Sequence, residues 1–279
     1  MNYLSSVSIC KQENPYIFDF YLMHRHLGVE RFLFFDREQN NLSEIFKNHK
    51  DVEVIYYPEP NRHHYAWAEG VKFFRGKSKW VQFIDIDQVT VPTCGSIPEM
   101  LERYEDCHAI GLNWHSFASS GREKPYYRLG PLGIAIVDTY GAYTKRAKAN
   151  RWVNGHIQSI VQVDHCESSP WGTPHNPPMK PGCNVFNTNK KVVYGYSSFP
   201  QLHDVGFIAH YYTRSREEWN KKIEKRRADT GETLNLDSHW KAALDDEGVD
   251  TAGDLFDVHN SYMNEVQDLT VADIWNSIG

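Results

Sequence analysis

The sequence predicts an α/β fold: a single Rossmann-like, mostly parallel sheet flanked by helices, followed by a C-terminal helical appendage. Three observations lead to this prediction. Short apolar runs with the length of buried strands recur through the first half of the chain. Amphipathic stretches with helical spacing lie between them. Polar residues follow several apolar runs directly, which is where open parallel sheets bind their ligands.

The expected elements alternate along the chain. Residues 7–10 predict a short buried strand, and the polar turn 11–15 opens a helix whose apolar positions run from Ile17 to Leu27. Gly28 is suited to end that helix. The further expected strands are 31–35, 52–57, 80–84 and 109–114, and the further expected helices are 42–48, 65–74 and 219–227.

The second half is less regular. Residues 168–184 are rich in proline, serine and glycine and predict an irregular loop. The tail 245–279 is acidic and carries only weak helical signals. We expect one main domain over residues 1–230 and an appendage over residues 231–279, without a clean linker between them.

The composition excludes several classes of protein. Hydrophobic residues make up 41% and charged residues 24% of the chain, as in ordinary globular proteins and unlike disordered or fibrous ones. The formal net charge of -6 argues against binding long polyanions, so we expect no nucleic-acid partner. Aromatic residues reach 14%, and such rings are useful for stacking on sugars or bases as well as for packing.

The location of the protein is expected to be cytoplasmic. No apolar stretch approaches the roughly 20 residues that cross a bilayer, and the first residues do not read as a secretory signal. The 5 cysteines are an odd number, widely spread and without a Cys-x-x-Cys pair. This pattern predicts neither a disulfide framework nor a zinc knuckle, and it favours a reducing compartment.

An acidic pair follows the fourth apolar run. Asp85 and Asp87 flank Ile86, and in an extended segment residues two apart point to the same side, so both carboxylates can face one ion. Oxygen ligands suit Mg²⁺ and Mn²⁺, which can bridge two phosphates of a nucleotide. The alternative is that the pair only caps a turn. The tripeptide alone favours that alternative, whereas its position in an alternating α/β half favours a metal site.

A second group lies around residues 208–215. His210 is suited to be a third ligand beside two carboxylates, and Arg214, Lys222 and Arg227 are suited to bind a diphosphate. The alternative makes His210 a core histidine and the basic run a solvated helix face. Neither Gly-x-x-x-x-Gly-Lys nor Gly-x-Gly-x-x-Gly occurs in the sequence, which disfavours P-loop and dinucleotide-binding proteins.

Together these segments resemble the family 92 glycosyltransferases and their bacterial and viral relatives, which include plant galactan synthases and animal core-fucose galactosyltransferases. The resemblance covers roughly residues 5–230 as an ordered series of short matches. Residues 80–88 resemble the Trp…Phe-Ile-Asp-x-Asp-Glu-Phe signature of the family, with Gln88-Val89 in place of Glu-Phe. The other matching segments are 10–16, 24–28, 34–36, 114–121 with Ala118 in place of a glycine, 158–161, His175 and 210–215.

The resemblance implies a GT-A fold, a nucleotide-sugar donor, best a UDP-linked one, and a metal ion held by Asp85, Asp87 and His210. The ion is Mn²⁺ or Mg²⁺. Residues 1–110 then form the half that binds the nucleotide sugar and residues 111–230 the half that binds the acceptor. The implied reaction transfers one sugar, with inversion, to a hydroxyl of a glycan or glycoprotein.

The hypothesis assigns further residues to each ligand. The nucleotide-sugar ligands are Lys11, Glu13, Asp36, Asp85, Arg214 and Lys222, and the acceptor ligands are Trp114, Ser119, Ser120 and Gly121. An inverting transferase needs a general base close to the acceptor hydroxyl. The sequence leaves four candidates for it, which are Glu123, Asp138, Asp164 and His175.

Other classes of function stay open at this point. A nucleotidyltransferase or phosphotransferase also uses an acidic pair and a metal ion. A catalytically silent carbohydrate-binding relative is suggested by Gln88 and the many aromatic residues. Galactose, xylose and glucose are equal candidates for the sugar, because one hydroxymethyl group is read by pocket shape. The sequence assigns no acceptor, linkage or oligomeric state.

Overall fold

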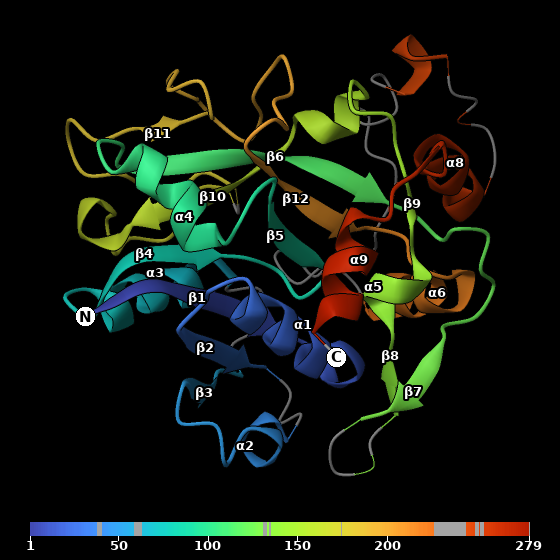
Figure 1. Ribbon diagram of the computed structural model, residues 1–279, viewed down its shortest axis with the longest axis horizontal. Coiled ribbons are helices and arrows are strands. Elements are labelled where there is room, and N and C mark those ends of the chain that lie inside the picture. The colour runs from blue at the N-terminus through green and yellow to red at the C-terminus, as the bar shows by residue number, and fades with distance from the viewer. Residues whose placement is uncertain are drawn as a thin grey trace.

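The computed structural model describes residues 1–37, 41–58, 63–130, 133, 135–173, 175–225, 244–248, 251 and 254–278. Its central feature is a mixed sheet with the strand order β13-β9-β6-β10-β4-β1-β2-β3. β11 and β12 pair with β6 beside this path, and β5 pairs with β12 (Figure 1). The strands of this sheet are β1 (Asn2–Cys10), β2 (Arg31–Asp36), β3 (Val52–Tyr56), β4 (Ser78–Phe83), β5 (Gln88–Pro92), β6 (Ala109–Phe117), β9 (Lys145–Arg146), β10 (Ile157–Gln162), β11 (Val185–Phe186), β12 (Gly206–Tyr211) and β13 (Val266–Gln267).

Most strands of the sheet point the same way. β1 pairs in parallel with β2 and β4, and β2 pairs in parallel with β3. β10 lies antiparallel between β4 and β6, so β4 and β6 again share one direction. β11 and β12 are parallel to β6, whereas β5 and β9 run against their neighbours. The predicted α/β fold with a mostly parallel sheet is therefore confirmed.

Helices cover both faces of the sheet, as the alternating sequence predicts. The helices are α1 (Asn14–His26), α2 (Leu42–Ile45), α3 (His63–Phe74), α4 (Ile97–Leu101), α5 (Thr139–Ala142), α6 (Arg216–Lys225), α8 (Leu255–Met263) and α9 (Thr270–Ser277). One core cluster joins α1, α2, α4, α5 and α9 to one face, where Phe20, Met100 and Val271 are buried. A second core cluster lies on the other face, where Trp67 and Val71 of α3 pack beside Trp171.

The sequence under-predicts several strands. β1 begins at Asn2, before the expected residue 7, because its early positions are buried serines and do not form an apolar run. Ser5 and Ser78 share a hydroxyl hydrogen bond of 2.6 Å, and Gln82 donates to Ser6 at 3.2 Å. These bonds satisfy polar groups inside the sheet. β5, β10 and β12 were not predicted from the sequence, since their polar and apolar residues do not form clear runs.

Residues near the C-terminus lie against the same sheet. β13 pairs with β9, which pairs with β6, and α9 packs against α5 (Figure 1). α8 lies over a third cluster that contains Val153, Val258 and Tyr262. Much of the predicted appendage, from 231 to 243, falls outside the described residues, as do residues 226–227 of the predicted helix 219–227. The division at residue 230 stays a prediction.

Two smaller features complete the fold. β7 (Tyr127–Leu129) and β8 (Ala135–Val137) form a separate antiparallel pair, and short 3-10 helices occur at η1 (Glu102–Tyr104), η3 (Trp152–Gly155) and η4 (Val163–His165). All five cysteines are free thiols in the structure. Within the described residues, every helix is too short or too polar to cross a membrane.

Candidate active site at the carboxyl ends of the strands

The sheet brings the first predicted site residues together. In the parallel register of β1 and β2, Cys10 lies opposite Asp36, so both strands end at the same edge. Lys11 and Glu13 follow β1 directly, and Glu13 is the last residue before α1. The side chain of Asp36 is buried at this edge. These three residues therefore lie at the carboxyl ends of two neighbouring parallel strands, where such sheets bind their ligands.

The acidic pair lies in a turn, which differs from the expected extended segment. β4 ends at Phe83, opposite Val7 of β1, and the backbone N–H of Gln88 then donates to the Asp85 carbonyl at 3.0 Å. A turn rotates successive side chains away from each other, so the rule that residues two apart share a side does not apply. Among the described residues, the ligand atoms of Asp85, Asp87 and His210 do not all lie close enough together to hold one ion.

Gln88 contributes to this turn. Its side chain is buried, and its Oε1 lies 3.5 Å from the backbone N–H of Asp85, which is a long hydrogen bond. The glutamine therefore supplies a neutral acceptor inside the turn.

Asp87 and His210 meet because β5 and β12 are antiparallel partners. The register pairs His210 with Gln88, and the backbone N–H of Tyr211 donates to the Asp87 carbonyl at 2.8 Å. The Asp87 Oδ2 atom lies 3.6 Å from His210 Nε2. Lys222 of α6 donates from its Nζ to the same Oδ2 at 3.1 Å and to the Tyr212 carbonyl at 2.9 Å. The structure thus joins three of the predicted site residues.

The charges of this group follow from its surroundings. Burial raises the pKa of Asp87, but Lys222 and His210 outweigh that effect and hold it well below its usual range. Burial lowers the pKa of His210 against the opposing effect of Asp87, so its imidazole is neutral near pH 7. The site therefore holds an anionic carboxylate beside a neutral imidazole and an ammonium group.

Arg214 stands out for its unsatisfied guanidinium. The residue is 8% exposed, and its Nε and Nη2 atoms make no hydrogen bond to any described part of the chain. The guanidinium lies over the ring of Tyr16, 3.8 Å from the centroid, and the backbone is left-handed with φ 54°. The pKa of Arg214 is raised: burial lowers it, but Tyr16, Glu218 and Asp87 together raise it more. Arg214 therefore carries a permanent positive charge and has N–H groups that no described part of the chain uses.

Glu218 fixes the start of α6 behind this arginine. It accepts from the Ser215 hydroxyl at 2.6 Å and from the Ser215 backbone N–H at 3.2 Å, while Ser215 Oγ accepts from the Glu218 N–H at 3.3 Å. This is a capping box. Glu218 also accepts from the hydroxyls of Tyr16, at 3.0 Å, and Tyr143. The bond from Tyr16 joins α1 to α6 next to Arg214, whose guanidinium stacks on the same tyrosine.

Asp87 and His210 together offer two ligand atoms to a divalent cation of the Mn²⁺ or Mg²⁺ type. One carboxylate oxygen and one neutral imidazole nitrogen face each other at 3.6 Å, close to the separation of about 3 Å between neighbouring ligands of an octahedral ion. His210 Nδ1 makes no hydrogen bond within the described chain, so packing against Trp114, with ring centroids 4.2 Å apart, orients the imidazole. Lys222 also donates to the Asp87 carboxylate, so a bound ion would displace this ammonium group in part.

A row of aromatic rings leads from His210 to the surface. Trp114 contacts His210, and it also stacks on His156 with ring centroids 4.8 Å apart. Tyr196 in turn stacks on His156 at 5.4 Å and is 37% exposed. Trp114 itself is 5% exposed, so the open stacking face expected of it is covered by His156. The exposed ring of this row belongs to Tyr196.

His175 is the candidate base that lies against this row. Its ring contacts Trp114 edge-on, with centroids 5.2 Å apart. His175 Nδ1 lies 3.3 Å from Gln158 Oε1, and Gln158 Nε2 donates to the Phe83 carbonyl. An amide oxygen only accepts, so the tautomer that makes this bond has its proton on Nδ1 and its lone pair on Nε2.

The other three candidates have different surroundings. Asp138 caps α5 by accepting from the Gly141 N–H at 3.1 Å. Glu123 is largely exposed and pairs with Arg216 at 3.3 Å. Asp164 lies exposed in η4. No described contact joins any of these three carboxylates to the group around Asp87.

In the predicted acceptor loop at Ser119–Gly121, both serine hydroxyl oxygens accept hydrogen bonds from other parts of the chain. Ser120 Oγ accepts the backbone N–H groups of Thr144, at 2.8 Å, and of the next residue, at 2.9 Å. Ser119 Oγ accepts from the Gly121 N–H at 3.0 Å and from the Asn264 amide at 3.3 Å. These bonds tie the loop to β9 and α8. The loop acts as a structural joint, and its part in acceptor binding stays a prediction.

Sequence reasoning missed several residues of the site. Tyr16 lies in the matching segment 10–16, where nothing in the sequence indicates a role, yet the Arg214 guanidinium stacks on its ring. Glu218 could have been found from the Ser-x-x-Glu capping signature at 215–218. His156 and Tyr196 carry no local signal, because the pairing of β10 with β6 brings His156 to Trp114, and a separate bridge between His156 and Ser197 brings the segment of Tyr196 to His156.

Comparisons with known proteins give only remote similarity. No family model and no curated protein matches the sequence. Among solved structures, 4-diphosphocytidyl-2C-methyl-D-erythritol synthase from Anaerococcus prevotii is 8% identical with a TM-score of 0.36, over 69% of this chain and 92% of that one. TarS 1–349 from S. aureus is 10% identical with a TM-score of 0.34, over 58% and 47%. Mannose-1-phosphate geranyltransferase from Thermus thermophilus is 13% identical with a TM-score of 0.32, over 58% of each chain.

Proposed function

We propose that this protein is a metal-dependent glycosyltransferase that moves one sugar from a UDP-linked nucleotide sugar to a glycan hydroxyl, with inversion. The observation that carries the proposal is the Arg214 guanidinium, buried beside Asp87 and Lys222 with two nitrogen atoms unpartnered in the described chain. A buried donor without a partner is costly, and a charged one more so. A diphosphate offers the bidentate acceptor that a guanidinium matches.

The position of the site agrees with a nucleotide ligand. Lys11, Glu13 and Asp36 follow neighbouring parallel strands, and they are the residues we assign to the nucleoside end of the donor. Arg214 connects the two groups, because it stacks on Tyr16 of α1 and lies close enough to Asp87 for their charges to interact. Arg214 and Lys222 then bind the diphosphate.

Asp87 and His210 are the residues we assign to the metal ion, with Asp85 beside them at the ribose or the ion. When bound, Mn²⁺ or Mg²⁺ supplies positive charge that stabilises the departing diphosphate. Lys222 contributes a second charge from α6. Preorganised charge at the leaving group is usually the largest part of such catalysis.

The acceptor side is assigned to the aromatic row. Tyr196 offers a partly exposed ring on which a sugar can stack. His175 is the base in this proposal: its Nδ1 proton is directed to Gln158, and Nε2 takes the proton of the acceptor hydroxyl. The loop at Ser119–Gly121 belongs to the acceptor side in this assignment, and its bonds to the Asn264 amide hold it against the end of α8.

The test is a calorimetric titration of nucleotide sugars with and without Mn²⁺, followed by an assay for released nucleoside diphosphate. We expect a UDP-sugar to bind more tightly with Mn²⁺. Arg214→Lys keeps the charge but removes the fork geometry, so it should weaken donor binding at least tenfold. Arg25→Lys is the matched control, since Arg25 lies half-exposed on α1 and pairs with Asp51. Equal donor affinity in both variants would refute the assignment.

The same assay separates the competing functions. Release of nucleoside diphosphate with transfer of the sugar supports the glycosyltransferase. Transfer of a nucleotidyl group, with release of pyrophosphate, identifies a nucleotidyltransferase. Sugar binding without release of either product identifies a silent carbohydrate-binding protein.

A further inference from the structure

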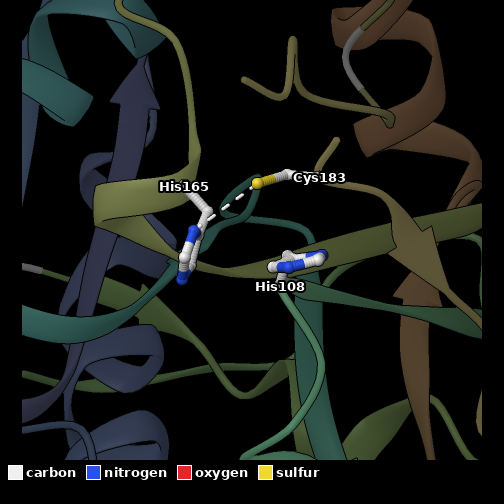
Figure 2. Close-up of side chains that lie close together, drawn as sticks. All are labelled: His108, His165 and Cys183. Atoms are coloured by element: carbon white, nitrogen blue, oxygen red, sulfur yellow. Dashed lines mark hydrogen bonds between the residues drawn. The ribbon is translucent and has the colours of Figure 1, made fainter. Parts of the chain in front are cut away.

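A cluster of metal-binding side chains lies away from the candidate active site. His108 directly precedes β6, His165 ends η4 after β10, and Cys183 lies two residues before β11. The strands themselves bring the three together, since β10 and β11 both pair with the start of β6 at Ala109. Figure 2 shows the two imidazole rings and the thiol turned toward a common space.

The distances suit ligands of one ion. One ring nitrogen of each histidine and the Cys183 sulfur lie within 4.8 Å of one another. Cys183 Sγ is 3.5 Å from His165 Nδ1 (Figure 2). Sulfur and nitrogen on one tetrahedral zinc ion stand about 3.6 Å apart, given Zn–S of about 2.3 Å and Zn–N of about 2.0–2.1 Å. The thiol and His165 already have this separation, and His108 needs a small shift.

Backbone hydrogen bonds hold the three segments in place. The N–H of Gln162 donates to the His108 carbonyl at 2.9 Å, and the N–H of Lys180 donates to the His165 carbonyl at 2.9 Å. The N–H of Asn184 donates to His108 Nδ1 at 3.2 Å, so this nitrogen presents its lone pair to the cysteine segment. An ion bound there would replace the hydrogen bond from Asn184.

We propose that His108, His165 and Cys183 bind a zinc ion through two imidazoles and a thiolate, with water at the fourth position. Two nitrogen ligands and one sulfur ligand are the donor set that zinc takes up, whereas Mn²⁺ and Mg²⁺ prefer oxygen. The thiol proton leaves to solvent when the thiolate binds. All three side chains are half-buried, so an ion can enter.

This zinc site is separate from the site at Asp87. Ser116, the β6 partner of His210, lies eight positions beyond His108 (116 − 108), or about 26 Å along a strand at roughly 3.3 Å per residue. The zinc ion therefore takes no part in the proposed sugar transfer. Its effect is on the chain between its ligands, because His165 and Cys183 enclose the loop that carries Trp171 and His175. The ion holds the two ends of that loop against the start of β6.

The experiment uses the full chain, stripped of metal and titrated with Co²⁺, whose bond to a thiolate gives a charge-transfer absorption. We expect that absorption to saturate at one Co²⁺ per chain and to disappear when Zn²⁺ is added. Cys183→Ser should abolish it, whereas Cys94→Ser should keep it, because Cys94 is an exposed thiol outside the cluster. Asp87→Asn should also keep it.

Three results would overturn the proposal. The first is the absence of thiolate absorption in the unmodified protein, which requires no variant to fold. The second is the same absorption in Cys183→Ser as in Cys94→Ser. The third is loss of the absorption in Asp87→Asn, which would show that the thiolate binds the metal only when the site at Asp87 is intact, against the separation of the two sites. A rise in melting temperature with Zn²⁺ that Cys183→Ser lacks would add support from stability.

Discussion

Acid should unfold this protein in part through His24. The side chain is fully buried in α1, where Nδ1 donates to the Phe20 carbonyl at 2.9 Å and Nε2 has no hydrogen-bond partner in the described chain. Burial, opposed only by the bond to Phe20, lowers the pKa of His24 from 6.5 to about 4. The native state therefore resists a proton that the unfolded chain accepts. Stability is retained above pH 6.5 and lost as the pH falls from 6.5 toward 4.

The size of the effect follows from the two pKa values. Between pH 7.5 and pH 5, proton uptake by the unfolded chain at this one site lowers the free energy of unfolding by about 2 kcal/mol. The assay is urea denaturation at both pH values. His24→Met removes the titrating group, so the loss between pH 7.5 and 5 should be about 2 kcal/mol smaller in this variant than in the unmodified protein. His26→Gln, an exposed change on the same helix, should keep the full loss. Identical pH dependence in His24→Met and the unmodified protein would refute the reasoning.

Three further predictions concern the site and its support. Asp87→Asn keeps the shape of the side chain but removes its charge, so turnover should fall by about 10²–10³-fold while the circular dichroism spectrum stays unchanged; full activity would contradict the role of Asp87. Tyr196→Ala should raise KM for the acceptor about fivefold, through loss of about 1 kcal/mol of stacking, with kcat unchanged, whereas Tyr56→Ala should leave both constants alone. Gly155→Ala puts a methyl group 2.0 Å from the phenyl ring of Phe199 and should lower the free energy of unfolding, measured by urea denaturation, by about 1–3 kcal/mol. The control is Gly172→Ala, whose methyl group meets no atom within 4 Å. Equal stability of these two variants would show that the ring moves aside.

The first half of the fold was predictable because its signals are local. The apolar periodicity of α1 and the apolar runs of β2, β3 and β4 each lie within one segment, and the structure has these elements close to their expected bounds. The meeting of Asp87, His210 and Lys222 was predictable in part, since charge and residue type suggested it. Their distances were not, because they depend on the pairing of β5 with β12 and on the packing of α6.

The geometry of the acidic pair illustrates the limit of local reasoning. An apolar run followed by Asp-Ile-Asp has the pattern of a continuing strand, but the chain turns at Asp85 so that Gln88 can begin a new strand along β12. The requirement comes from β12, more than a hundred residues further along the sequence. The stacking of His156 on Trp114 has the same origin in distant pairing.

The pairing of β12 with two strands limits which insertions and deletions the sequence can accept. His210 is aligned with Gln88 of β5 on one side and with Ser116 of β6 on the other. A slip of one residue would replace the imidazole by Ala209 or Tyr211 and turn it to the opposite face. Insertions and deletions inside this strand should therefore be fatal to the site, and lineages that diversify in substrate should do so through the connecting loops.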